Sequence, residues 1–252
     1  MIWLDALSPL PTAVNLGLIG LSMLTSGLSA AAGIGGGTLL IATMAQVMPA
    51  AALIPVHGMV QLGSNLGRAS MTWRHIDWPR IAAFAPGALI GALFAAWLLI
   101  RLPSGILELT IAAFVLLMCW GPSLPSRSLG RVGTLLAGAI TTLLSSLVGA
   151  SGPLVAVFLK QISNERLVRV ATFSTAMSLQ HLSKAFVFGM AGFVFRDWLG
   201  LMAMMITAGV VGTWLGLRLL RRLTDTRFDV LLKWVLTLLA LRLLWLAAGE
   251  LI

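Results

Sequence analysis

Gly33-Ile34-Gly35-Gly36-Gly37 interrupts a long apolar run in the first half of the chain, and Gly149-Ala150-Ser151-Gly152-Pro153 does so at the matching place in the second. We call these stretches the first and the second glycine break. A broken membrane helix leaves backbone N–H and C=O groups that lipid cannot satisfy, so such breaks persist only where they pack against protein or line a cavity. A matched pair, one in each half, is typical of a transporter binding site.

The composition is that of an integral membrane protein. Of the 252 residues, 59% are hydrophobic and 10% are charged, whereas about 25% of a soluble domain is charged. Residues 1–252 are therefore expected to form a single membrane domain. The formal net charge of +9 fits basic cytoplasmic loops, and no charge run interleaved with aromatic residues predicts nucleic-acid binding. No Cys/His cluster predicts a metal site, and no motif predicts a cofactor.

Long helices can be predicted from the apolar runs, because a membrane span needs about 20 apolar residues. We expect them over residues 11–32, 51–71, 79–100, 105–120, 130–149, 165–189, 197–220 and 228–249. Two short segments, 35–48 and 152–162, follow the glycine breaks and suit either half-helices or re-entrant hairpins. The predicted fold class is an all-α polytopic membrane protein with about eight long helices and two short segments.

The two halves of the chain also resemble one another. An offset of 116 residues aligns the glycine breaks, Asn65 with His181, and Arg68 with Lys184. Further along, Gly87 and Gly91 match Gly212 and Gly216, at a spacing typical of close helix packing. This self-similarity predicts a first repeat over residues 11–120 and a second over residues 130–249.

Loop charge predicts how the repeats are oriented. When the chain is followed from one side of the membrane, twelve basic residues fall on one side and two on the other. The twelve are Arg74, Arg80, Arg127, Arg131, Lys160, Arg166, Arg169, Arg218, Arg221, Arg222, Arg227 and Lys233, and the two are Arg101 and Arg196. Under the positive-inside rule the crowded side is the cytoplasm. Both termini should then lie on the non-cytoplasmic side of the membrane, and the two repeats should be inverted.

A polar stripe runs along the long helix that follows each break. Its members recur every three or four residues, which places them on one helix face. The first stripe is His57, Gln61, Ser64, Asn65 and Arg68, and the second is Ser174, Ser178, His181 and Lys184. Because polar groups are costly in lipid, both stripes should face inward, and the inverted repeat would bring them together near the breaks.

These features together predict an anion site. Half-helix N-termini present free N–H groups and a partial positive charge, and the stripes add two basic side chains but no Asp or Glu. The predicted site residues are Gly33, Gly35, Gly36, Gly37, His57, Gln61, Asn65, Arg68, Gly149, Ser151, Gly152, Pro153, Ser178, His181 and Lys184. The predicted partners are a small anion and the lipid bilayer, and the sequence leaves a homo-oligomer open.

Structural roles are open for some of these residues. Arg68 and Lys184 lie near helix ends, where their side chains could instead snorkel to lipid headgroups. His57 and His181 could instead hydrogen-bond to neighbouring helices. Tryptophans near helix ends are expected to act as interfacial anchors: Trp73, Trp78 and Trp198.

The chain resembles the sulfite exporter TauE/SafE family of membrane permeases over nearly its whole length. The resemblance rests on Gly33-Ile34-Gly35-Gly36-Gly37, on the polar helix that follows, and on the second break ending in Gly152-Pro153, in this order. It implies an inner-membrane carrier, not an enzyme, for small and often sulfur-containing anions such as sulfite or organosulfonates, commonly moved outward. Such a carrier would work by alternating access.

Two other functions remain as alternatives. Gly149-Ala150-Ser151-Gly152 also matches the G-x-S-G motif of rhomboid intramembrane proteases, in which Ser151 would be the nucleophile and His181 its base. The repeat explains these glycines independently, which favours the transporter. A passive anion channel is the second alternative, since inverted repeats and broken helices favour a carrier only moderately.

Overall fold

The computed structural model describes residues 7–32, 35–99, 104–121, 130–149, 152, 154–155, 165–219 and 226–251. Within these ranges the regular elements are helices, as predicted. They are α2 (Thr12–Ala32), α3 (Gly36–Met44), α4 (Ala50–Met71), α5 (Trp78–Leu99), α6 (Ser104–Trp120), α7 (Arg131–Val148), α9 (Arg166–Met190), α10 (Leu199–Leu219) and α11 (Thr226–Leu251), with 3-10 turns at Trp73–His75 and Phe195–Trp198. The eight long helices and the first short segment are confirmed. The second short segment, predicted over 152–162, lies largely outside the described residues.

Glycine allows the chain to turn where the helices break. Gly35 precedes α3 with φ of 102°, and Gly149 ends α7 with φ of 78°, a backbone region that other residues rarely adopt. The end of α7 lies against α3, because a Cβ on Gly149 would overlap the Ile41 side chain. Five other break residues lie outside the described residues: Gly33, Ile34, Ala150, Ser151 and Pro153.

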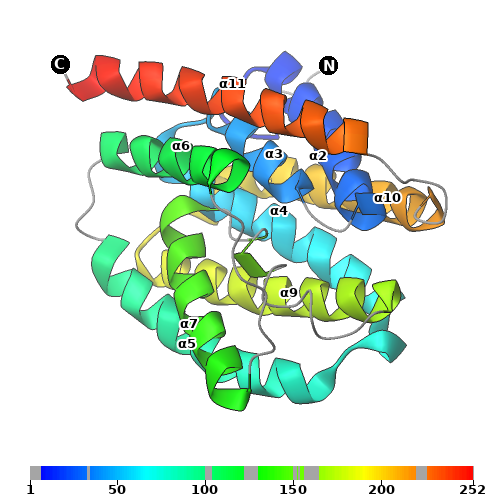
Figure 1. The fold of residues 1–252 in the computed structure, drawn as a ribbon. Coiled ribbons are helices and arrows are strands. Elements are labelled where there is room, and N and C mark those ends of the chain that lie inside the picture. The colour runs from blue at the N-terminus through cyan, green and yellow to red at the C-terminus, as the bar shows by residue number, and fades with distance from the viewer. Residues whose placement is uncertain are drawn as a thin grey trace.

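The helices pair in a pattern that recurs in both halves (Figure 1). Near the centre, α4 lies against α9; α2 packs along α10, as its counterpart α7 packs along α5. Likewise α4 contacts α10, and α9 contacts α5, while α6 and α11 pair with each other. Each half therefore pairs its first helix with a helix of the other half, which fits two related repeats. Their limits and their inverted orientation stay predictions.

Glycines hold these pairs at the same close approach. On α5, a Cβ at Gly87 would overlap the carbonyl oxygen of Leu135 in α7; on α10, a Cβ at Gly212 would overlap that of Met23 in α2. One turn further, the matched glycines Gly91 and Gly216 meet carbonyl oxygens in the same way. The prediction that these four glycines are packing contacts is confirmed, and a larger side chain at any of them would force the paired helices apart.

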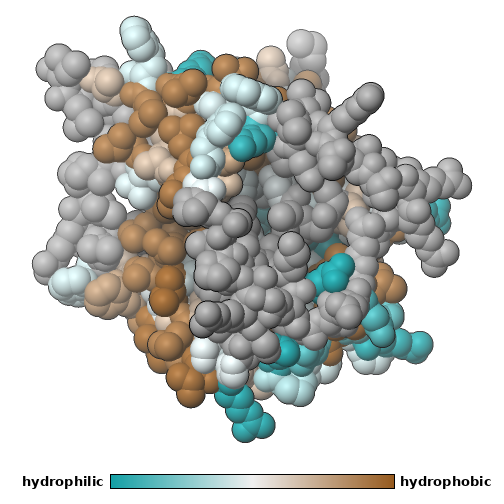
Figure 2. Space-filling model, viewed as in Figure 1, coloured by the Kyte–Doolittle hydropathy of each residue, from teal (hydrophilic) through white to brown (hydrophobic). Residues whose placement is uncertain are grey.

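Among the described residues, four helices are long and apolar enough to cross a membrane: α2, α5, α7 and the helix over Phe195–Arg218, which includes nearly all of α10. Large apolar side chains stay exposed along α5, among them Leu93, Phe94 and Trp97, and apolar residues form a band down the left of the view in Figure 2. Such a surface suits lipid. The anchor prediction was wrong for Trp198, which is only 6% exposed because it packs into the main hydrophobic core, whereas Trp73 and Trp78 are exposed.

Candidate functional site

Helix α4 carries its polar stripe into the interior of the protein. His57, Ser64, Asn65 and Arg68 are each at most 4% exposed, and Gln61 is 8% exposed. This burial places α4 inside the bundle, where other protein groups can satisfy the polar side chains.

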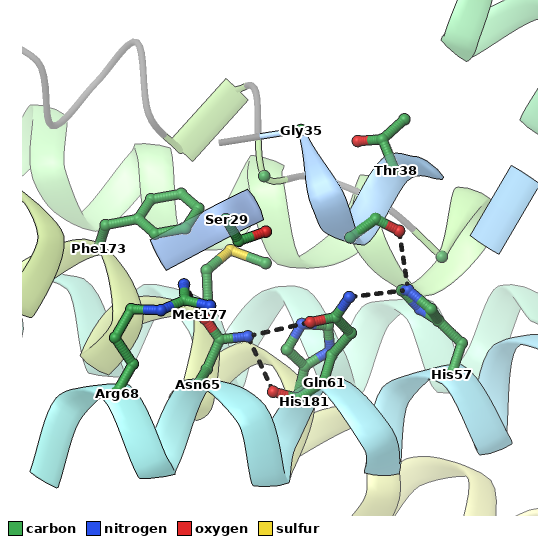
Figure 3. Close-up of a pocket in the computed structure, with 13 residues that line it drawn as sticks. Ser29, Gly35, Thr38, His57, Gln61, Asn65, Arg68, Phe173, Met177 and His181 are labelled. Carbon is green, nitrogen blue, oxygen red and sulfur yellow. Dashed lines mark hydrogen bonds between the residues drawn. The ribbon is translucent and has the colours of Figure 1, made fainter. Parts of the chain in front are cut away.

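Hydrogen bonds link the α4 side chains to one another and to their neighbours (Figure 3). His57 Nε2 lies 3.1 Å from the carbonyl oxygen of Gly37 and 3.4 Å from Gln61 Nε2. Asn65 Nδ2 donates to the backbone oxygen of Gln61 at 2.8 Å. Arg68 makes only two long contacts of 3.5 Å, to Asn65 Oδ1 and to the carbonyl oxygen of Ser26, and its Nε has no partner. The guanidinium therefore keeps donors for a ligand.

The N-terminus of α3 meets this stripe. Gly35, Gly37 and Thr38 line the same cavity as His57 and Arg68, and no side chain caps the helix at Gly35. The first N–H groups of a helix have no acceptor within it and carry a partial positive charge. Gly37 allows α3 to approach α4, because a Cβ there would lie 2.7 Å from Gln61 Nε2. The sequence thus folds a helix end onto a polar helix face.

The second stripe, on α9, divides between the cavity and the surrounding structure. The ring of His181 lies 6.1 Å from that of His57, edge to face, and both of its nitrogens lack a partner. Lys184 Nζ instead donates to the carbonyl oxygens of Ser145 and Gly149, both at 3.3 Å. These carbonyls end α7, where a cation is favourable. Lys184 therefore ties the second break to α9.

Neither basic residue reaches the surface of the described structure. Arg68 is 2% exposed and Lys184 is 1% exposed, which contradicts the alternative that they snorkel to headgroups. Among the described residues, the ion pair found is Arg80 with Asp77, at 3.1 Å. Both buried cations thus lack an acidic partner within that part of the chain.

One small cavity, of about 30 Å³, collects residues of both repeats. Nine predicted residues line it: Gly35, Gly37, His57, Gln61, Asn65, Arg68, Gly149, Gly152 and His181. Three others lie near it but do not line it: Gly36 packs on α2, Ser178 bonds to its own helix, and Lys184 caps α7. Gly33, Ser151 and Pro153 lie outside the described residues.

Sequence reasoning missed four of the lining residues. Ser29 and Thr38 flank the first break, and Phe173 and Met177 precede His181 on α9. A search for polar stripes passes over a phenylalanine and a methionine. The 116-residue offset would have found both, because it carries His57 onto Phe173 and Gln61 onto Met177.

The chain matches a known protein family. The family of sulfite exporter TauE/SafE proteins matches residues 18–243, nearly the whole chain. The chain belongs to the TauE/SafE family. TauE/SafE proteins are membrane transporters and not enzymes, so the protease alternative built on Ser151 is not supported. No curated protein and no solved structure matches the chain.

Proposed function

We propose that this TauE/SafE protein carries a small anion, sulfite or a sulfonate, out of the cytoplasm of a bacterium by alternating access, one repeat moving against the other. The predicted residues that line the cavity would form its binding site. The N–H groups of α3 and the side chains of Gln61 and Asn65 would donate hydrogen bonds, and Arg68 would supply the full positive charge. The anion would be a transported substrate, so no cofactor enters the proposal.

Arg68 carries this proposal. A buried cation without a counter-charge is costly, and a guanidinium binds oxyanions through paired N–H groups. Here it lies at a cavity wall with donors to spare and with no acidic partner among the described residues. The cavity's volume of about 30 Å³ suits an ion of few heavy atoms, because one water needs roughly 10–15 Å³ by this measure.

Sulfite flux in liposomes tests the proposal. The purified chain should move radiolabelled sulfite at a rate that saturates with concentration, and unlabelled sulfite on the far side should accelerate exchange, because a carrier returns faster when loaded. Liposomes without protein are the control. A flux that rises linearly with sulfite concentration, and that unlabelled sulfite does not accelerate, would instead support the passive channel. The absence of any flux of sulfite or of small sulfonates would contradict the proposal.

Outward movement of an anion agrees with the inside-negative membrane potential of a bacterium. A −1 anion leaving an inside-negative cell gains about 2.3 kcal/mol per 100 mV, so efflux needs no coupling ion. The orientation itself rests on the twelve basic residues that crowd one predicted side.

A reporter fusion measures that orientation. Alkaline phosphatase, which is active only outside the cytoplasm, should be active when fused after Ile252, because both termini are predicted to lie outside. The same reporter fused after Arg127, in a predicted cytoplasmic loop, should be inactive. The reverse pair of results would show that the protein has the opposite orientation in the membrane, with both termini in the cytoplasm.

A further inference from the structure

The two halves of the chain supply unlike walls to the cavity. The first half contributes polar side chains: Ser29, Thr38, His57, Gln61, Asn65 and Arg68. The second half contributes Phe173, Met177, His181 and two glycines. Figure 3 shows Arg68 and Asn65 reaching in from α4, and Met177 and Phe173 line the same cavity. The cavity is therefore polar on one side and largely apolar on the other.

The repeat shows where this difference arises. The offset that pairs Asn65 with His181 places Phe173 at the position of His57 and Met177 at that of Gln61. A phenyl ring and a thioether have no N–H or O–H to donate. Two positions that carry hydrogen-bonding side chains in the first half, His57 and Gln61, therefore correspond to apolar side chains in the second half.

Packing fixes both apolar side chains in place. Phe173 is 9% exposed and Met177 is 5% exposed, and both belong to a buried apolar cluster with Ile81 and Phe84 of α5. The Phe173 ring also lies against the second break, with its Cζ 3.7 Å from where a Cβ on Gly152 would stand. A buried oxygen facing this wall would find no side-chain donor on Phe173 or Met177.

We propose that Phe173 and Met177 are specificity-determining residues, which admit anions with oxygens on one side only and reject anions with oxygens all round. This inference rests on the proposed anion transport. Sulfite and sulfonates carry three oxygens on one side of sulfur and a lone pair or a carbon on the other. Sulfate and phosphate would bury a fourth oxygen against Phe173 and Met177, which cannot donate to it, and leaving a buried polar group without a hydrogen bond is costly.

Three anions test this specificity in liposomes that contain the full chain. Methanesulfonate and sulfamate have the same charge and nearly the same shape, but sulfamate has NH₂ in place of CH₃. Methanesulfonate should show a kcat/KM about tenfold above that of sulfamate, the size of effect that one group makes in an apolar pocket. Sulfate, which adds a second charge and a fourth oxygen, should move more slowly still.

Met177→Gln should reduce the preference for methanesulfonate to about one or reverse it, because it restores the residue type of Gln61 on the apolar wall. Met177→Leu is the matched control, since it keeps the wall apolar and should keep the wild-type ratio. If Met177→Gln is not recovered from membranes, the wild-type ratio of kcat/KM for methanesulfonate to that for sulfamate tests the inference by itself.

Two results would overturn the inference while leaving anion transport intact. In one, the wild type transports sulfamate or sulfate with the same kcat/KM as methanesulfonate. In the other, Met177→Gln folds and keeps the wild-type ratio. If none of these anions and no sulfite crosses the membrane, the proposed function fails, and the specificity falls with it.

Discussion

Arg68→Gln should lower the kcat/KM of sulfite transport by about 10- to 100-fold. The substitution removes a charged donor from the cavity wall, and a hydrogen bond to a charged group contributes about 1.5–3 kcal/mol, while 1.4 kcal/mol corresponds to a factor of ten. Arg68→Lys should fall between, because it keeps the charge and loses the planar pair of N–H groups. Initial rates in liposomes, at matched amounts of inserted protein, measure both.

The matched control is Arg74→Gln. Arg74 is an exposed arginine a short distance along the chain, and its guanidinium stacks over the Trp73 ring at 5.5 Å. It does not line the cavity, so its loss should leave sulfite transport unchanged. If a folded Arg68→Gln protein transports sulfite at the wild-type rate, the proposed anion site is contradicted, because that site depends on Arg68.

The helices of this protein were predictable because lipid demands long apolar runs. Glycine and proline mark several of their ends: Gly35 precedes α3, Pro49 precedes α4, and Gly149 ends α7. For the pairs α2 with α10 and α5 with α7, the sequence offered only the matched glycines. Such glycines predict that another helix packs closely there, but they do not say which helix it is.

The cavity was harder to predict than the helices. Its polar wall follows from period and chemistry, since His57, Gln61 and Arg68 share one face of α4. Lys184 shares the corresponding face of α9, yet the register between α9 and α7 places its Nζ on the carbonyl oxygens of α7 instead. Such a register is set by packing across the whole bundle, which no local pattern of residues encodes.

Gly212→Ala should destabilise the folded protein by about 1–3 kcal/mol, the usual cost of overpacking a tight contact. The new Cβ would overlap the carbonyl oxygen of Met23, and backbone cannot swing aside as a flexible side chain can, so α2 and α10 must move apart. At roughly 2–4 °C per kcal/mol for a chain of this size, the melting temperature in detergent should fall by about 2–12 °C. Gly87→Ala, at the matched position on α5, should cost about as much.

Gly20→Ala is the control that separates packing from backbone entropy. Gly20 lies on the exposed side of α2, with no neighbouring atom within 4 Å of an added Cβ, and alanine favours a helix over glycine by about 1 kcal/mol. Its melting temperature should therefore stay level or rise. Equal stability of all three alanine variants would mean that these glycines set no helix distance. A lower melting temperature for Gly212→Ala and Gly87→Ala alone would show that the same kind of contact holds α2 against α10 and α7 against α5.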